Sequence, residues 1–293
     1  MGLFLQAVWG GILFGSVYGL MALGLTMIWG TLNLLNLAHG AIFVLAAYVA
    51  FALGATFLHL PVLLTFALAI VAAGVLGMLM YTGVVRPMLG RPGWNEAAWI
   101  ATLGISLIIE NAALVLFGGE TRAIPTVLSG ALRKSGVVIT FQGIFVVVVA
   151  ISALLILNFF LRRSRHGLAI RAISQDGNAA RLMGVRVQQA FLIVLVVSAA
   201  LAGLAGVLLS STLYLSPTSG LQPMLLALIV TIFGGLGSVK GTILAAYIVG
   251  TIEAFAEVYV GVGLALPILF VFIIAVLIIR PNGLFGTVEG SRL

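Results

Sequence analysis

The sequence predicts an all-α integral membrane protein, a polytopic helical bundle of about nine transmembrane segments (eight to ten). Hydrophobic residues make up 62% of the 293 residues and charged residues only 7%. The mean hydropathy is +1.29. A soluble domain carries about 25% charged residues, so this chain has too few charged residues to form a water-facing surface. We therefore expect residues 1–293 to form a single membrane domain.

The third observation is a series of apolar stretches of roughly 17 to 25 residues, the length that crosses about 30 Å of hydrocarbon as a helix. They are Gln6–Trp29, Leu32–Leu58, Pro61–Val84, Ala97–Phe117, Phe141–Leu161, Ala190–Leu213, Met224–Leu236, Gly241–Val260 and Leu264–Ile279. The seventh is short: it is either a crossing that starts nearer Ser219 or a re-entrant or broken segment. The runs are continuously apolar and do not alternate, which disfavours a β-barrel.

The composition also excludes several classes of chemistry. The chain has no cysteine, and hence no disulfide, thiol nucleophile or thiolate metal site. It contains no HExxH sequence and no Ser with His and Asp nearby, so we expect neither an enzyme nor a metal site. The stretch FGGLGSVKG at 233–241 lacks the GxxxxGK[ST] spacing and predicts a tight turn at the membrane boundary. We expect this chain to bind no cofactor itself.

Basic residues predict the orientation. If all nine segments cross, eleven of the fourteen Lys and Arg lie on one side, which the positive-inside rule makes cytoplasmic. Arg122, Arg133 and Lys134 remain on the other side. The net charge of +7 thus follows membrane loops, which argues against nucleic acid. The loop 162–187 and the C-terminus are expected in the cytoplasm, and the N-terminus outside for nine crossings or inside for eight or ten.

The cytoplasmic loop between the fifth and sixth segments is predicted to hold a short helix within RAISQDGNAARLMGVRV, residues 171–187. Asp176 or Ser174 can cap its N-terminus, and Gly184 can end it in a left-handed conformation. Residues four apart in a helix share a face, and this face is predicted to carry small residues beside two larger apolar side chains. These six residues, the candidate coupling peg, are Ala172, Asp176, Ala180, Gly184, Leu182 and Met183. The alternative is an ordinary basic loop held near anionic lipid headgroups.

Polar side chains enter the second segment at Asn33, Asn36 and His39. Their spacing of three predicts one helix face, and the cost of unpaired polar groups in hydrocarbon predicts that this face points to the bundle or to a water-filled path. Helix–helix hydrogen bonding is the alternative. His39 has no adjacent ligand that would make a metal site.

Carboxylates fall inside predicted spans at Glu110, with Asn111 beside it, and at Glu253 and Glu257. The last two are four residues apart and share a helix face. A charge at the centre of a membrane-spanning helix costs roughly 2.5 to 3.5 kcal/mol on insertion scales. We therefore expect these carboxylates to line a cavity in the outer half of the membrane. There they can bind the ammonium group of a zwitterion. Snorkelling, or a protonated carboxyl that donates between helices, is the alternative.

Four stretches together resemble the permeases of branched-chain amino acid ABC transporters, most closely the LivH type. They are LNLAHG (35–40), RHGLAIRAISQDGNAARLMGV (165–185), GGLGSVKGTILAAYIVGTIEA (234–254) and RPNGLFG (280–286). The resemblance implies an inner-membrane permease that pairs with a second, LivM-like permease subunit, two cytoplasmic ATPase subunits that use ATP, and a periplasmic substrate-binding protein. It places the coupling helix, which docks on the ATPase, at the loop described above. Glu110 departs from the family pattern, which commonly has a neutral amide there.

Two functional classes remain open from the residues. One is an importer permease without its own ATPase, which accounts for a cytoplasmic peg in a chain that lacks a nucleotide motif. The other is an autonomous channel or ion-coupled carrier, in which Glu110, Glu253 and Glu257 would be proton or cation sites. Within the resembling family the substrates are branched-chain amino acids, while close relatives handle urea, short amides or other amino acids.

Overall fold

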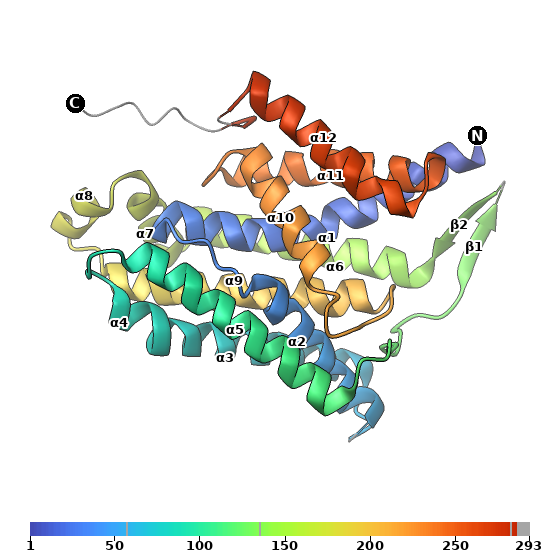
Figure 1. Cartoon of the computed structure of the whole chain (residues 1–293), viewed down its shortest axis with the longest axis horizontal. Coiled ribbons are helices and arrows are strands. Elements are labelled where there is room, and N and C mark those ends of the chain that lie inside the picture. The colour runs from blue at the N-terminus through green and yellow to red at the C-terminus, as the bar shows by residue number, and fades with distance from the viewer. Residues whose placement is uncertain (57, 135, 282, 286–293) are drawn as a thin grey trace.

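The computed structural model describes residues 1–56, 58–134, 136–281 and 283–285, and shows an elongated bundle of helices with one small hairpin (Figure 1). The α-helices are α1 (Gly2–Leu32), α2 (His39–Phe51), α3 (Val62–Met80), α4 (Arg86–Met88), α5 (Trp94–Phe117), α6 (Phe141–Arg163), α7 (Arg165–Gln175), α8 (Gly177–Leu182), α9 (Val187–Ser210), α10 (Leu221–Gly234), α11 (Val239–Tyr259) and α12 (Val262–Ile279). Two π-helical turns, η1 (Ala52–Thr56) and η2 (Tyr81–Val85), extend α2 and α3. Strands β1 (Ala131–Lys134) and β2 (Val137–Thr140) pair antiparallel.

Eight of the helical segments in the described part of the chain are long and apolar enough to cross a membrane. They correspond to eight of the nine predicted segments, which confirms the predicted fold class. The exception is the seventh, α10, whose 14 residues extend only about 21 Å. The sequence marked this segment as short, and α10 does begin near Ser219, at Leu221.

The two ends of the bundle differ in charge as predicted. Helices α4, α7 and α8 lie together at one end, and the hairpin and the N-terminus lie at the other (Figure 1). The basic loop 162–187 is therefore far from Arg122, Arg133 and Lys134. By the positive-inside rule the α7–α8 end is cytoplasmic and the hairpin end is outside. Arg292, one of the eleven cytoplasmic residues, lies outside the described residues.

The second predicted segment is not one continuous helix, which corrects the sequence interpretation. Helix α1 runs on to Leu32 and ends at Asn33, which adopts a left-handed conformation with φ of 52°. Asparagine tolerates this conformation better than most residues. The chain then runs without helix to α2, and the Asn36 side-chain oxygen accepts the Ala38 N–H at 3.1 Å. Asparagines that seemed to mark a helix face instead form a break between two helices.

Helix α2 therefore begins inside the bundle. The His39 ring Nε2–H donates to the Met21 carbonyl at 3.1 Å. At the rise of an α-helix, Met21 lies about 16 Å before the end of α1 at Leu32. Residues 33–38 thus run back along α1 before α2 starts. Such irregular backbone is tolerated at membrane depth only where protein or water covers it, and Asn36 and His39 are both buried.

The first turn of α2 meets the first turn of α10. After α9 the chain passes Leu215, which pairs with Arg122 near the hairpin end, and then turns inward to Gly220. A Cβ on Gly40 would lie 2.6 Å from the Gly220 carbonyl oxygen. Glycine is required here because the two backbones approach closely. Helices α2 and α10 therefore begin side by side within the bundle.

Helix α1 forms the centre of the bundle, and 83% of the residues in its most apolar 18-residue stretch are buried. Two of its glycines face α11: a Cβ on Gly11 would lie 2.8 Å from Thr251, and one on Gly15 would lie 2.8 Å from Tyr247. Toward the cytoplasmic end, the Thr26 and Thr242 hydroxyls hydrogen-bond at 2.8 Å. Small residues and hydroxyl pairs of this kind hold helices together in lipid, where apolar burial gives no advantage.

Replacing Gly40 by alanine is expected to lower the melting temperature of the purified protein in detergent by a few degrees. The added methyl meets the backbone of Gly220, and overpacking of this kind costs about 1–3 kcal/mol. Gly104→Ala is the matched control, because nothing lies within 4 Å of a Cβ at that helical glycine. Equal melting temperatures for the two variants would contradict the close contact between α2 and α10.

Candidate functional site

A cavity of about 250 Å³ lies in the outer half of the bundle. Its walls come from α1, α2, α10 and α11, from the end of α9 and from the chain that follows α9. The aromatic rings of Phe14, Tyr18 and Phe43 line it together with aliphatic side chains such as Leu209 and Leu213. The cavity thus combines an apolar wall with the polar group described next.

Glu253 is the buried polar group of this cavity, with only 1% of its surface exposed. Its carboxylate interacts with the side chains of Tyr18 and Gln222, and among the described residues its Oε2 atom has no hydrogen-bond partner. Glu257, one turn further along α11, also lines the cavity and is half-buried. The two carboxylates thus lie on one face of α11 and line the same cavity. No lysine or arginine of the described residues lines it.

Glu110 and Asn111 do not line this cavity. Helix α5 packs on α2, away from α11. The Glu110 carboxylate accepts a hydrogen bond from Ser106 Oγ at 3.1 Å, and the Asn111 amide donates to the Leu107 carbonyl at 2.8 Å. Both groups find partners on their own helix, one turn back, and need no cavity.

Asn33, Asn36 and His39 also do not form the predicted helix face. Because the chain breaks between α1 and α2, Asn33 is exposed at the end of α1 whereas Asn36 and His39 are buried. None of the three lines the outer cavity. Their local effect is to place the first turn of α2, and with it Phe43, against that cavity.

Sequence reasoning missed Tyr18 and Gln222, the two neighbours of Glu253. Tyr18 places a hydroxyl in the middle of the strongly apolar α1, and Gln222 follows the Ser/Thr-rich stretch before α10. Either could have been noted as a polar group in hydrocarbon. Their meeting depends on the α1–α11 contact and on the inward path of residues 211–220, which no local pattern predicts.

At the cytoplasmic end, the predicted short helix is confirmed as α8, preceded by α7. The Asp176 carboxylate accepts the Asn178 and Ala179 N–H groups at 2.9 and 3.0 Å, which makes it the N-cap. Gly184 has a φ of 82°, with the Val185 N–H bonded to the Ala180 carbonyl, the hydrogen bond of a Schellman motif. Both predicted caps therefore hold.

The predicted small-residue face is wrong. Asp176 is extended and ends α7, so Ala172 and Ala180 belong to two different helices. Ala180 packs inward and is only 5% exposed, whereas Leu182 and Met183 are 89% and 85% exposed. An N-cap residue has non-helical dihedrals, so the same Asp176 that starts α8 interrupts the four-residue repeat. The exposed surface of α8 and its C-terminal turn includes the apolar pair Leu182 and Met183.

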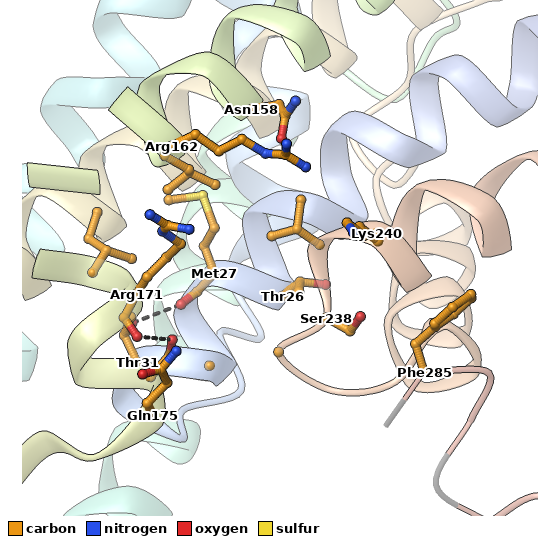
Figure 2. A pocket seen from close by; sticks show the side chains of 16 residues that line it. Thr26, Met27, Thr31, Asn158, Arg162, Arg171, Gln175, Ser238, Lys240 and Phe285 are labelled. Atoms are coloured by element: carbon orange, nitrogen blue, oxygen red, sulfur yellow. Dashed lines mark hydrogen bonds between the residues drawn. The ribbon is translucent and has the colours of Figure 1, made fainter. Parts of the chain in front are cut away.

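A second pocket, of about 370 Å³, lies at the cytoplasmic ends of α1, α6, α7 and α11. Figure 2 shows the side chains of Arg162, Arg171 and Lys240 around it. One wall is the glycine turn before α11, where Ser238 Oγ caps the helix by accepting the Gly241 N–H at 3.2 Å. The turn lies on the end of α1: a Cβ on Gly30 would lie 3.2 Å from Gly237 Cα. The predicted boundary turn is thus confirmed.

Comparisons with known proteins identify relatives over the full length. A family model described as the permease component of branched-chain amino acid transport systems matches residues 8–280. BraD of Pseudomonas aeruginosa, a high-affinity branched-chain amino acid transport system permease protein, is 31% identical over 99% of this chain and 98% of its own. LivH of Escherichia coli K12, described in the same words, is 30% identical with the same coverage.

A solved structure shares the fold. PsaBC from Streptococcus pneumoniae in complex with Fab aligns over 96% of this chain and 93% of its own, with a TM-score of 0.53 and 15% sequence identity. At that level of identity the likeness concerns the arrangement of helices.

A cysteine introduced at Met183 should react quickly with a membrane-impermeant maleimide in inside-out vesicles, and a cysteine at Ala180 slowly. The burial of Ala180 and the exposure of Met183 give the reason, and the absence of native cysteine makes each introduced thiol the only one in the chain. Right-side-out vesicles are the control for sidedness. Equal rates at the two positions, or labelling from the outside, would refute the placement of α8.

Proposed function

This chain belongs to the family of branched-chain amino acid transport permeases, and we propose that it forms part of the translocation path of an ATP-binding-cassette importer in the cell inner membrane. The observation that carries the proposal is the pairing of two features at opposite ends of one bundle. An outer cavity with a buried carboxylate suits a small polar solute with an apolar part. A projecting apolar pair on a capped cytoplasmic helix suits docking to a partner.

The transported solute is proposed to be a branched-chain amino acid. The names of the relatives support this assignment, and so does the cavity. Phe14, Phe43 and Leu209 offer an apolar wall to an aliphatic side chain, while Glu253 offers a charge to the polar end. Pockets for drug-sized ligands usually span about 300–1,000 Å³, so a cavity near 250 Å³ suits a single small solute.

Energy is proposed to come from two cytoplasmic ATPase subunits that use ATP, while this chain binds no cofactor of its own. Leu182 and Met183 would insert into an ATPase groove, and α7 would carry the motion to α1. The contact that supports this step is the packing of α7 on the end of α1: a Cβ on Gly30 would lie at van der Waals distance, 3.9 Å, from the Ser174 Cβ. The same α1 helix carries Tyr18 at the outer cavity.

The remaining proposed partners are a second, LivM-like permease subunit and a periplasmic binding protein that delivers the substrate. Large apolar side chains cover the outside of α5 and α12. In the most apolar 18-residue stretch of each helix, only 17% of the residues are buried within the chain. Membrane lipid or a second permease must cover these surfaces, because exposed apolar patches of this size are unfavourable in water.

Reconstitution with the partner subunits tests the proposal. Proteoliposomes that hold this chain, its second permease, its ATPases and its binding protein should accumulate leucine only when ATP is present on the cytoplasmic side. The double variant Leu182→Glu/Met183→Glu should abolish this uptake and the co-purification of the ATPases, because two charges would enter an apolar interface. The fold should be unaffected, since both side chains are exposed.

Leu132→Glu is the matched control, an exposed apolar residue of the outer hairpin that should leave ATPase co-purification unchanged. Uptake that needs no ATP and is abolished by an ionophore would contradict the importer and favour an ion-coupled carrier. Normal ATPase binding by the double variant would overturn the assignment of the docking surface.

A further inference from the structure

We propose that the outer cavity recognises its solute as a zwitterion, with Glu253 binding the ammonium group and the first turn of α10 binding the carboxylate. This inference rests on the proposed function and adds to it the chemical basis of recognition. It implies that an amino acid binds here far better than an analogue that lacks either charge.

Glu253 supplies the first half of the argument. The carboxylate is almost completely buried, and Oε2 has no partner among the described residues. Its neighbours Tyr18 and Gln222 are neutral, Glu257 is acidic, and no lysine or arginine of the described chain lines the cavity. A buried carboxylate is costly unless a cation or several donors pair with it. An ammonium group, with three donors and a positive charge, meets that need.

The first turn of α10 supplies the second half. No side chain caps this 14-residue helix, although an α-helix leaves its first amide groups without intrahelical partners. The positive end of the helix dipole favours an anion at that position. Ser219, Gln222 and Pro223 belong to this turn or adjoin it, and all three line the cavity. The helix start therefore presents a backbone N–H and the Gln222 amide to a carboxylate.

The two halves of the site adjoin at Gln222. Gln222 is the second residue of α10 and its side chain also interacts with the Glu253 carboxylate, so the cation site and the anion site share this residue. The ammonium and carboxylate of an α-amino acid are held by one carbon, which matches two adjacent subsites. The aliphatic side chain can then lie on Phe14, Phe43 and Leu213.

The interrupted helices explain why the site exists. If residues 211–234 formed one long helix, the Gln222 N–H would bond to the preceding turn and not face the cavity. With the break before α10, the Leu221 N–H donates to the Thr218 carbonyl at 3.3 Å, and the Gln222 N–H has no intrahelical partner. The close contact of Gly220 with Gly40 holds the start of α10 in place. Half-helices that direct their N-termini at an anionic group are a recurring solution in transporters.

The test measures occupancy of the cavity itself with a cysteine at Leu213, which lines the cavity and is 52% exposed. In the assembled transporter in proteoliposomes, without binding protein, leucine should slow alkylation of this cysteine by a small hydrophilic reagent. Isoamylamine, which lacks the carboxylate, and 4-methylpentanoate, which lacks the ammonium, should need about tenfold higher concentrations or more, equivalent to about 1.4 kcal/mol.

Glu253→Gln in the Leu213→Cys background should raise the protecting leucine concentration by about tenfold or more, and should remove the advantage of leucine over 4-methylpentanoate. Glu110→Gln is the matched control, a carboxylate in a membrane helix that lies away from the cavity, and should leave protection unchanged. The analogue series on the chain with intact Glu253 keeps the test valid if Glu253→Gln does not fold.

Equal protection by leucine and 4-methylpentanoate would overturn the ammonium site, and equal protection by isoamylamine would overturn the carboxylate site. No protection by leucine would overturn the whole inference. These failures differ from a failure of the proposed function, because leucine uptake with ATP and binding protein, measured in the same proteoliposomes, would persist.

Discussion

The packing of α1 against α11 is the contact on which the rest of the structure depends. Gly11 and Gly15 on α1 allow the backbones to approach: a Cβ on Gly250 of α11 would lie 2.8 Å from Gly15 Cα. A side chain at any of these positions would separate the helices. Because the two helices run antiparallel over most of their length, one contact places residues together at both ends of the bundle.

At the outer end this packing brings Tyr18 to Glu253, and at the cytoplasmic end it brings Thr26 to Thr242. Both cavities are consequently lined by the same two helices. A shift of α1 relative to α11 would change the outer cavity and the cytoplasmic pocket together. Since α7 packs on the end of α1, this pair of helices is a short physical connection between a docked ATPase and the substrate cavity, and gating motions of this kind are common in proteins with coupled sites.

The sequence predicted the parts of this structure that depend on local chemistry. Hydropathy over windows of bilayer length found the spanning helices, basic residues gave the orientation, and Asp176 and Gly184 gave both ends of α8. The spacing of Glu253 and Glu257 placed them correctly on one face, because α11 is a regular helix there. The errors arose where a capping residue breaks the periodicity. Asn33 and Asp176 each end a helix, so spacings counted across them, from Asn33 to His39 and from Ala172 to Ala180, did not describe one face.

The partners of Glu253 could not be predicted for a different reason. Tyr18, Gln222 and Glu253 lie on three helices far apart in the sequence, and their meeting requires both the glycine contact of α1 and the inward turn at Gly220. The hydropathy of the sequence also does not reveal such a turn, because an interrupted segment that is buried in protein is as hydrophobic as a continuous helix in lipid. The short length of α10 was the one visible sign of it.

The central claim, that the outer cavity and the cytoplasmic helices form one coupled unit, is tested most directly by the alkylation rate of a cysteine at Leu213 in the assembled transporter. The rate should change severalfold when ATP is added under conditions that prevent hydrolysis, and the double variant Leu182→Glu/Met183→Glu should remove that change. A rate that is the same with and without ATP in a complex that imports leucine would contradict the coupling.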